Sequence, residues 1–257
     1  MKIKRSGWSL PYFIFLLLFV ALPLVLIAVY ALQDSSGRFT LDNIGRFFSD
    51  SDALSTFALS LEVAVENTLI CLLLGYPAAW ILANRKYNRS TVTIILFILP
   101  MWINALMRTL ATAELFNMLG VELGKGTLLY GMAYDYLPFM VYPIYNILQK
   151  IDPSYAEAAE DLGATPSKVF LKVTLPLSMP GVISGVMMVF MPTVSTFAIS
   201  EFLTNSKIKL FGTIIQENIN SSMWNYGAAL SLIMLVIIGI TSLFDNKSSA
   251  AAQEGVI

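Results

Sequence analysis

The sequence predicts an all-α protein with six helices that cross a membrane. Of its 257 residues, 56% are hydrophobic and only 13% are charged, whereas a soluble domain usually carries about 25% charged residues. The apolar residues form continuous runs of about 20, which is the helix length needed to cross the hydrocarbon layer. A membrane β-barrel would instead show short strands of alternating polarity. Much of the surface is therefore expected to face lipid.

Six segments have the required length and apolar character. They are Leu10–Leu32, Leu59–Ala83, Ile94–Phe116, Leu128–Leu148, Val182–Leu203 and Tyr226–Phe244. We expect a single transmembrane domain over residues 1–257, embedded over about 10–244. The first segment follows a basic N-terminus and could imitate a signal peptide, but it is too long and no small-residue cleavage site follows it. We therefore expect this segment to be retained as a helix.

The distribution of Lys and Arg predicts the orientation in the membrane. Cations gather at the N-terminus and in the second and fourth connections, 84–93 and 149–181. These cations are Lys2, Lys4, Arg5, Arg85, Lys86, Arg89, Lys150, Lys168 and Lys172. Because short loops rich in Lys and Arg stay on the cytoplasmic side, we predict that both termini and the even-numbered loops are cytoplasmic.

The fourth connection, 149–181, is predicted to contain two short helices. Asp152 can cap the first helix, and Gly163 suits the left-handed position that often follows a helix. Thr165 and Pro166 repeat the capping signal for a second helix, which is expected to end before Pro176. On the first helix, small residues recur at Ala156, Ala159 and Gly163. Such a narrow face allows close approach of a partner, although an amphipathic hairpin lying on its own membrane domain fits the same pattern.

One motif in this connection carries a family resemblance. Glu157-Ala158-Ala159 is followed by Gly163 and, after nine further residues, by Val173-Thr174-Leu175-Pro176. The motif resembles the EAA signature of bacterial ABC-importer permeases, with Val173 at the usual Ile. The resemblance implies the six-helix type I permease architecture and an EAA coupling loop over 149–181, in which Glu157, Ala158, Ala159, Gly163, Leu175 and Pro176 dock an ABC ATPase dimer.

The resemblance covers nearly the whole chain, from about Leu10 to Phe244. The segments that carry it are Leu74–Trp80, Leu99–Asn104, Leu137–Tyr145 and Leu175–Val182. They are similar to the PotB-type permeases of spermidine/putrescine importers, although permeases for iron, thiamine, sulfate or sugars share much of the pattern. The resemblance implies a bacterial inner membrane location, a second permease subunit of the PotC type, and an extracellular or periplasmic substrate-binding protein.

Charged residues inside the predicted spans are candidates for the transport path, because burying a charge in lipid costs roughly 2.5–3.5 kcal/mol on insertion scales. Arg108 lies about 14 residues into the third segment from the cytoplasmic side, and Asp135 about seven residues into the fourth from the outer side. At about 1.5 Å per residue, both lie roughly 20 Å above the cytoplasmic edge. They could face each other, either as a structural ion pair or as part of a substrate path.

Two further residues are candidates for contact with a cationic cargo. Glu201 is expected near the outer end of the fifth helix, and Trp102 nearer the middle of the membrane. A polyamine carries several ammonium groups, which carboxylates and aromatic rings bind by ion pairing and cation–π contact. The aromatic rings also fit simple anchoring at the membrane surface. Other acidic residues expected near the outer ends of helices are Glu62, Glu66 and Glu114.

Several other classes of protein are disfavoured by what the sequence lacks. It has no histidine, and its one cysteine, Cys71, lies in an apolar run. No phosphate-binding P-loop is present, because Gly124-Lys125-Gly126 lacks the upstream Gly and the following Ser or Thr. We therefore expect no enzyme activity, no cofactor and no metal, with ATP hydrolysis on a partner subunit. An ATPase-independent secondary transporter is the less favoured alternative.

Overall fold

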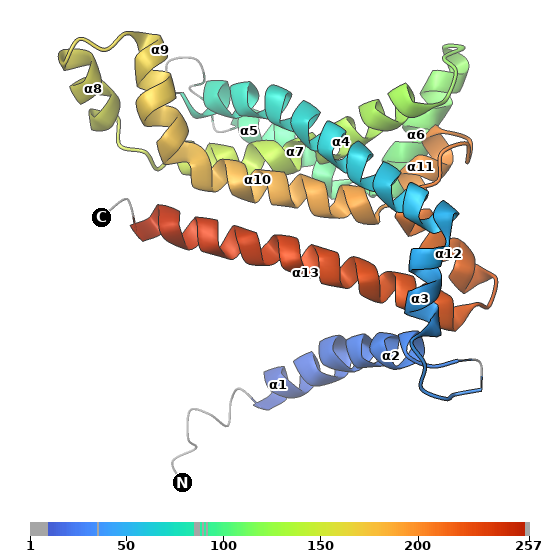
Figure 1. Ribbon diagram of the computed structural model, residues 1–257. Helices are drawn as coiled ribbons and strands as arrows, with labels where there is room; N and C mark the ends of the chain where they lie inside the picture. Colours follow the sequence, from blue (N-terminus) through green and yellow to red (C-terminus); the bar gives the residue numbers. More distant parts are fainter. Residues whose placement is uncertain (1–9, 35, 85–87, 89, 91, 255–257) are drawn as a thin grey trace. The chain divides into compact units, whose positions relative to one another are not determined.

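The computed structural model describes residues 10–34, 36–84, 88, 90 and 92–254, and in this part of the chain all the named elements are helical (Figure 1). An isolated bridge joins Gln33 to Phe39. The chain divides into two compact units, which are described separately: residues 1–55 with 214–237, and residues 56–213 with 238–257. The basic residues Arg85, Lys86 and Arg89, used above to predict orientation, lie outside the described residues, as does the N-terminal basic cluster.

The first unit contains the N-terminal helical run and the region that follows it. Its elements are α1 (Leu10–Leu16), the π-turn η2 (Leu17–Ala21), α2 (Leu22–Ala31), α3 (Asp42–Ser49) and parts of α4, α12 (Phe211–Asn220) and α13 (Trp224–Glu254). The amide of Asn225 donates hydrogen bonds to the carbonyl oxygens of Tyr30 at 3.1 Å and Gln33 at 2.8 Å. These bonds hold the end of α2 against the start of α13 and satisfy carbonyl groups that the end of a helix leaves free.

The second unit contains most of the remaining helices. They are α4 (Ser51–Ala83, which begins in the first unit), α5 (Val92–Ile98), η3 (Leu99–Trp102), α6 (Ala105–Met118), α7 (Lys125–Leu148), α8 (Ser154–Asp161), α9 (Pro166–Val169), η4 (Phe170–Thr174), α10 (Leu175–Ser195) and α11 (Ala198–Leu203). The main core lies where α4, α7 and α10 meet, around the fully buried side chains of Cys71, Met140 and Val189. Burial of Cys71 agrees with its place in an apolar run.

Two glycines bring α10 close to α7. A Cβ atom at Gly181 would lie 2.9 Å from the carbonyl oxygen of Pro143, and one at Gly185 would lie 2.8 Å from the sulfur of Met140. Small residues at such spacing let two helix backbones approach in a membrane protein. The role of the Gly181-x-x-x-Gly185 motif in the structure is therefore packing between helices of the same chain.

Two buried hydrogen bonds join α4 to α10. The Asn67 side-chain amide donates to the Thr193 hydroxyl at 3.0 Å, and the hydroxyls of Tyr76 and Ser178 lie 2.8 Å apart. In lipid, polar groups on facing helices must find partners within the protein. The two bonds therefore fix the register of α4 against α10.

A π-turn precedes a Leu-Pro pair at two places in the chain. The turn η2 comes before Leu22-Pro23, and η4 comes before Leu175-Pro176. Proline lacks an N–H group, and its ring collides with the carbonyl four residues earlier in a regular α-helix. The wider π-turn, with its hydrogen bonds to the fifth residue, makes room for the ring. Both helical runs consequently continue through their prolines.

The bounds of the spans differ from those predicted. By length and composition, the described residues contain four helices able to cross a membrane: Pro11–Ala31, Ser51–Ala83, Pro166–Ser195 and Trp224–Ser242. A fifth is formed if the bent pair Val92–Trp102 and Ala105–Met118 counts as one span. The predicted fourth segment does form one continuous helix, the 24-residue α7, but this helix is not among those four or five.

The predicted third and fifth segments were wrong as continuous helices. The third bends by 90° after Trp102, because Asn104 starts a new helix by accepting hydrogen bonds from the backbone N–H groups of Leu106 and Met107. The fifth begins earlier, at Pro166, and ends at Ser195, where Thr196 adopts an extended conformation. Glu201 consequently lies on the separate helix α11.

Candidate functional site

The loop that carries the EAA-like motif folds as two helices joined by a tight turn, as predicted. The first, α8, begins at Ser154, and the Asp152 carboxylate accepts a hydrogen bond from the Ser154 N–H at 2.9 Å. This bond is the main cause of the lowered pKa of Asp152. Gly163 has a φ angle of +80°, in the left-handed region predicted for it. The turn thus depends on a residue without a Cβ atom.

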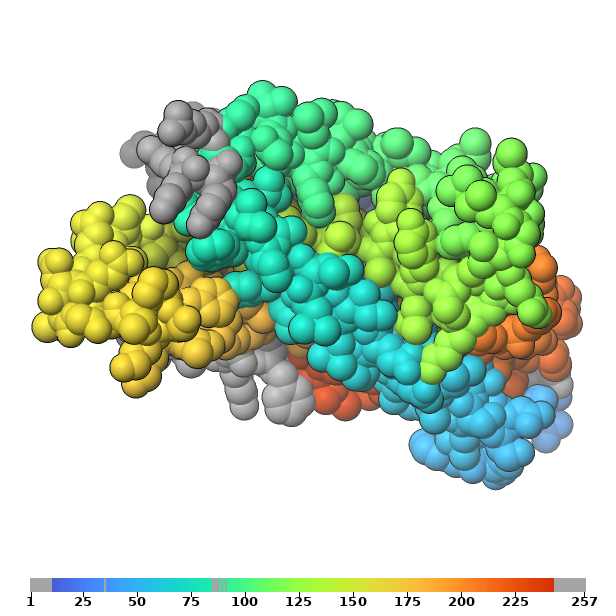
Figure 2. Space-filling model, turned by 90° about the horizontal axis from the view of Figure 1, so that it is seen from above, coloured from blue at the N-terminus to red at the C-terminus, as the bar shows by residue number. Residues whose placement is uncertain are grey.

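The surface of α8 is left uncovered in the isolated chain. None of its residues is buried, Glu157 and Ala158 are exposed, Ala159 is half-buried, and Leu162, directly after the helix, is 90% exposed. Figure 2 shows α8 and α9, in yellow and gold, gathered at one end of the second unit. An exposed helix with an apolar residue at its end is suited to contact with another protein.

The second helix of the loop does not end before Pro176, contrary to the prediction. α9 passes through η4 directly into α10, and Leu175 and Pro176 are the first two residues of α10. The π-turn accommodates the proline ring, so the chain has no need to break there. A single helical run, Pro166–Ser195, therefore connects the loop to the helix that packs against α7.

Two grooves lie beside the loop at the end of α4. The first has a volume of about 500 Å³ and the second about 520 Å³. The first is lined by Tyr76, Pro77, Trp80, Pro166, Ser167, Phe170 and Leu171. The second is lined by Trp80, Ala83, Asn84, Leu148, Gln149, Ile151, Pro153 and Thr174. Trp80 belongs to both grooves.

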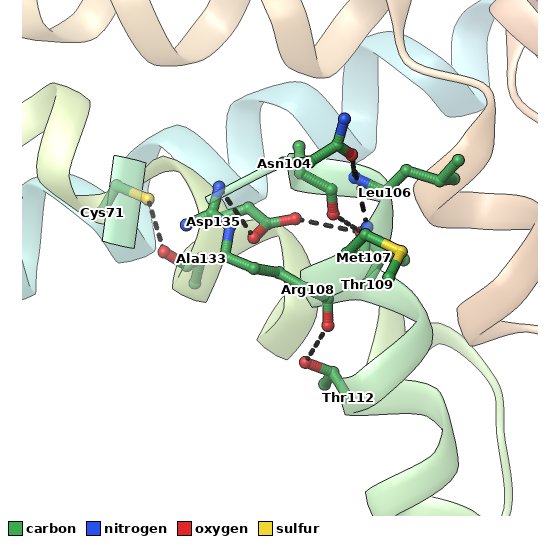
Figure 3. Close-up of polar contacts among 10 residues, drawn as sticks. Cys71, Asn104, Leu106, Met107, Arg108, Thr109, Thr112, Ala133 and Asp135 are labelled. Atoms are coloured by element: carbon green, nitrogen blue, oxygen red, sulfur yellow. Dashed lines mark hydrogen bonds and ion pairs between the residues drawn. The ribbon is translucent and has the colours of Figure 1, made fainter. Parts of the chain in front are cut away.

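Arg108 and Asp135 form a buried ion pair between α6 and α7 (Figure 3). The Arg108 Nη2 and Asp135 Oδ1 atoms lie 3.1 Å apart, and the two side chains are only 6% and 3% exposed. The Thr109 hydroxyl lies 3.2 Å from Asp135 Oδ2 and 2.9 Å from the carbonyl oxygen of Ala105. The structure thus brings together the two charges that the sequence placed at one depth.

The guanidinium of Arg108 is only partly satisfied. Its Nε and Nη1 atoms are buried and have no hydrogen-bond partner in the described chain. The guanidinium carbon lies 5.7 Å from the centre of the Tyr134 ring, within the range of a cation–π contact. A carboxylate usually binds arginine through two parallel hydrogen bonds, whereas this contact uses a single nitrogen.

Trp102 and Glu201 are placed apart from this ion pair. Trp102 ends η3 with its side chain 85% exposed, and Glu201 is exposed on α11. Within the described residues, neither side chain makes a hydrogen bond or ion pair with Arg108 or Asp135. The structure therefore brings together two of the four predicted path residues.

A second charged cluster was missed in the sequence because its cation comes from another helix. The Lys125 ammonium, at the start of α7, lies 2.7 Å from a carboxylate oxygen of Glu62 and 2.9 Å from one of Glu66 on α4. Hydrogen bonds to Glu62 and then Glu66 raise the pKa of Lys125. The spacing of four residues between the acids was a usable signal, since it puts them on one face of a helix.

The family match and the curated relatives of this chain agree with each other. Residues 6–247 match the family described as "Binding-protein-dependent transport system inner membrane component". The chain is 33% identical to the spermidine/putrescine transport system permease protein PotB of Escherichia coli K12, covering 100% of this chain and 99% of that protein. It is 31% identical to PotB of Haemophilus influenzae, covering 89% and 88% of the two chains. As predicted, this family consists of transport components of the membrane rather than enzymes.

Solved structures show the same fold. One is a chain of a bacterial ABC transporter involved in the import of the acidic polysaccharide alginate, with a TM-score of 0.71, 18% identity and 94% of each chain covered. Another belongs to the inward-facing MetNI methionine ABC transporter, with a TM-score of 0.61, 14% identity, and 77% of this chain and 95% of that one covered. The chain therefore belongs to the family of binding-protein-dependent transport system inner membrane components, as a permease subunit of an ABC importer.

Proposed function

We propose that this permease carries a polyamine, spermidine or putrescine, inward across a bacterial cell membrane. The observation that carries the proposal is 33% identity over the full chain to the E. coli PotB permease, whose name states that cargo. The acidic and aromatic candidates for a cationic cargo support it in this chain: Glu201 and Trp102 are both exposed. An ammonium group is bound by carboxylates and by the faces of aromatic rings.

The coupling loop is proposed to receive the motion of a partner ATPase. Closure of an ATPase dimer would shift the helices between outward-open and inward-open states, since a partner that binds one state better increases its population. The exposed surface of α8, with Glu157, Ala158 and Ala159, would supply the contact together with the turn at Gly163. The uninterrupted helical run through Leu175 and Pro176 supports transmission, because it leads from the loop into the α7–α10 core.

Substitutions in the loop test this coupling. Glu157→Lys reverses a charge on the docking face, and Gly163→Pro is incompatible with a φ angle of +80°. Both variants should lose ATPase binding and uptake while the helices remain in the membrane. Glu122→Lys, which reverses an exposed charge between α6 and α7, is the matched control. Normal ATPase co-purification and normal uptake in both loop variants would contradict the coupling role.

The remaining partners follow from the same proposal. The complex would contain a second permease of the PotC type and a binding protein on the outer side, with both termini of this chain in the cytoplasm. Native mass spectrometry of the purified complex is expected to show one copy of this chain beside a different permease. Two copies of this chain without a second permease would contradict the heteromeric arrangement.

Uptake measurements test the cargo. Proteoliposomes holding the complete complex should accumulate radiolabelled spermidine, and unlabelled putrescine should compete. Glu201→Gln and Trp102→Ala should each lower uptake without reducing assembly, whereas the control Glu122→Gln should not. Transport of sulfate, ferric ion or a sugar in place of both polyamines would refute the cargo but not the permease assignment.

A further inference from the structure

The contact between Arg108 and Asp135 is incomplete for a permanent ion pair. Arg108 uses one of its nitrogens, at 3.1 Å, and leaves Nε and Nη1 buried without partners. Buried polar groups in folded proteins are almost always hydrogen-bonded, and an exception calls for an explanation. The pair therefore balances charge, but it leaves two guanidinium nitrogens and Asp135 Oδ1 without a hydrogen bond.

The helix that carries the acid belongs to the main core. Asp135 lies on α7, which packs along α10 in the core, whereas Thr109, 3.2 Å from its second oxygen, lies on α6 beside Arg108. Arg108 begins the second turn of α6, four residues after Asn104, where the chain bends by 90°. A change in this bend would swing Arg108 while Asp135 stayed in place. The geometry thus suits a carboxylate that keeps its position and a cation that can leave.

We propose that Asp135 is a binding site for an ammonium group of the cargo, and that Arg108 occupies this site as an internal cation until the cargo replaces it. The inference rests on the proposed polyamine transport. Tyr134, whose ring centre lies 5.7 Å from the guanidinium carbon, would present its ring to either cation. Exchange of one cation for another keeps Asp135 neutralised throughout, and the displaced Arg108 would have to reach water in the open transport path, because an unpaired charge in the membrane is costly.

A purely structural ion pair makes a different prediction. Replacing both partners of a buried ion pair by uncharged residues of similar shape is often harmless, whereas removing one partner leaves a buried charge. The double variant Arg108→Gln with Asp135→Asn should therefore assemble whichever role is correct. If the pair is only structural, this variant transports normally; if Asp135 binds the cargo, it does not.

The experiment measures spermidine uptake and ATP hydrolysis by the complete complex in proteoliposomes. The double variant is expected to assemble but to raise the KM for spermidine at least tenfold. The control Lys207→Gln with Glu122→Gln removes an exposed ion pair, 57% and 88% exposed, and should leave KM unchanged.

A charge-swapped variant covers the case in which the neutral pair does not assemble. Arg108→Asp with Asp135→Arg keeps an ion pair but moves the carboxylate from α7 to α6, so it too should raise KM. A wild-type KM in either assembled double variant would overturn the inference while leaving polyamine transport intact. Absence of polyamine uptake by the wild-type complex would instead refute the proposed function.

Discussion

The close packing of α10 on α7 predicts that Gly181 cannot accept even one methyl group. A Cβ atom there would lie 2.9 Å from the carbonyl oxygen of Pro143 and 3.0 Å from the Cα atom of Ile144. Both are backbone atoms, so neither can move aside by changing a rotamer. Reaching an ordinary contact of 3.4 Å requires a shift of the two helices by 3.4 − 2.9 = 0.5 Å.

The expected cost follows from two opposing effects. Overpacking in a tight core typically costs about 1–3 kcal/mol. Replacing glycine by alanine inside a helix stabilises the folded protein by roughly 0.5–1 kcal/mol. Gly181→Ala should therefore destabilise the protein by about 0–2.5 kcal/mol, and by about 1–3 kcal/mol relative to a helical Gly→Ala change in open space. At Gly75 the opposing atoms belong to the side chains of Met140 and Val141, so the same change should cost less.

The free energy of unfolding in mixed detergent micelles measures this effect. Gly239→Ala is the matched control, because it lies in a helix and a Cβ atom there would meet nothing within 4 Å. The control should be neutral or slightly stabilising. A Gly181→Ala variant as stable as the Gly239→Ala variant would refute the packing argument.

Three further outcomes are expected. Thr193→Val should destabilise by about 1 kcal/mol, because the buried Asn67 amide loses its acceptor; unfolding measurements should show Thr193→Ser closer to wild type. Gly163→Ala should cost roughly 1–2 kcal/mol in the same assay through its φ angle of +80° alone, since open space surrounds its Cβ position. The Ala53 N–H lowers the pKa of Asp50, so the stabilisation from that carboxylate is present above the ordinary pKa of 3.8 and is lost as the pH falls through the lowered value. An NMR titration of Asp50 with a midpoint at or above 3.8 would contradict this assignment.

The sequence predicted local features of the fold well. The turn at Gly163 and the helix after Thr165 depend on residues close together in the chain, so their signals are visible without a structure. The breaks after Trp102 and Ser195 were not predicted, because apolar residues continue through both. The first break follows the local cap at Asn104, a signal present in the sequence. Beside the second break the chain makes a tertiary contact: a Cβ atom at Gly212 would lie 2.5 Å from the carbonyl oxygen of Ser195.

The pairing of Arg108 with Asp135 was predicted correctly, but from an assumption about the third helix that the structure contradicts. The equal depth of Arg108 and Asp135 assumed a straight third helix, yet that segment bends by 90°. The two residues still meet because the bend comes before Arg108, and the part of the segment that carries Arg108, α6, lies beside α7. The contribution of Thr109 could not be predicted, since a threonine hydroxyl in a helix usually bonds its own backbone.

The buried pair also has a consequence for how the chain is made. Arg108 precedes Asp135 by 27 residues, and a short connection after Met118 joins their helices. If α6 entered the bilayer first, Arg108 would lie in the membrane without a counter-charge. The free energy of insertion would then be less favourable by roughly 2.5–3.5 kcal/mol on insertion scales. Entry of α6 and α7 together, as a hairpin, removes that cost. The ion pair thus ties the insertion of one helix to the synthesis of the next.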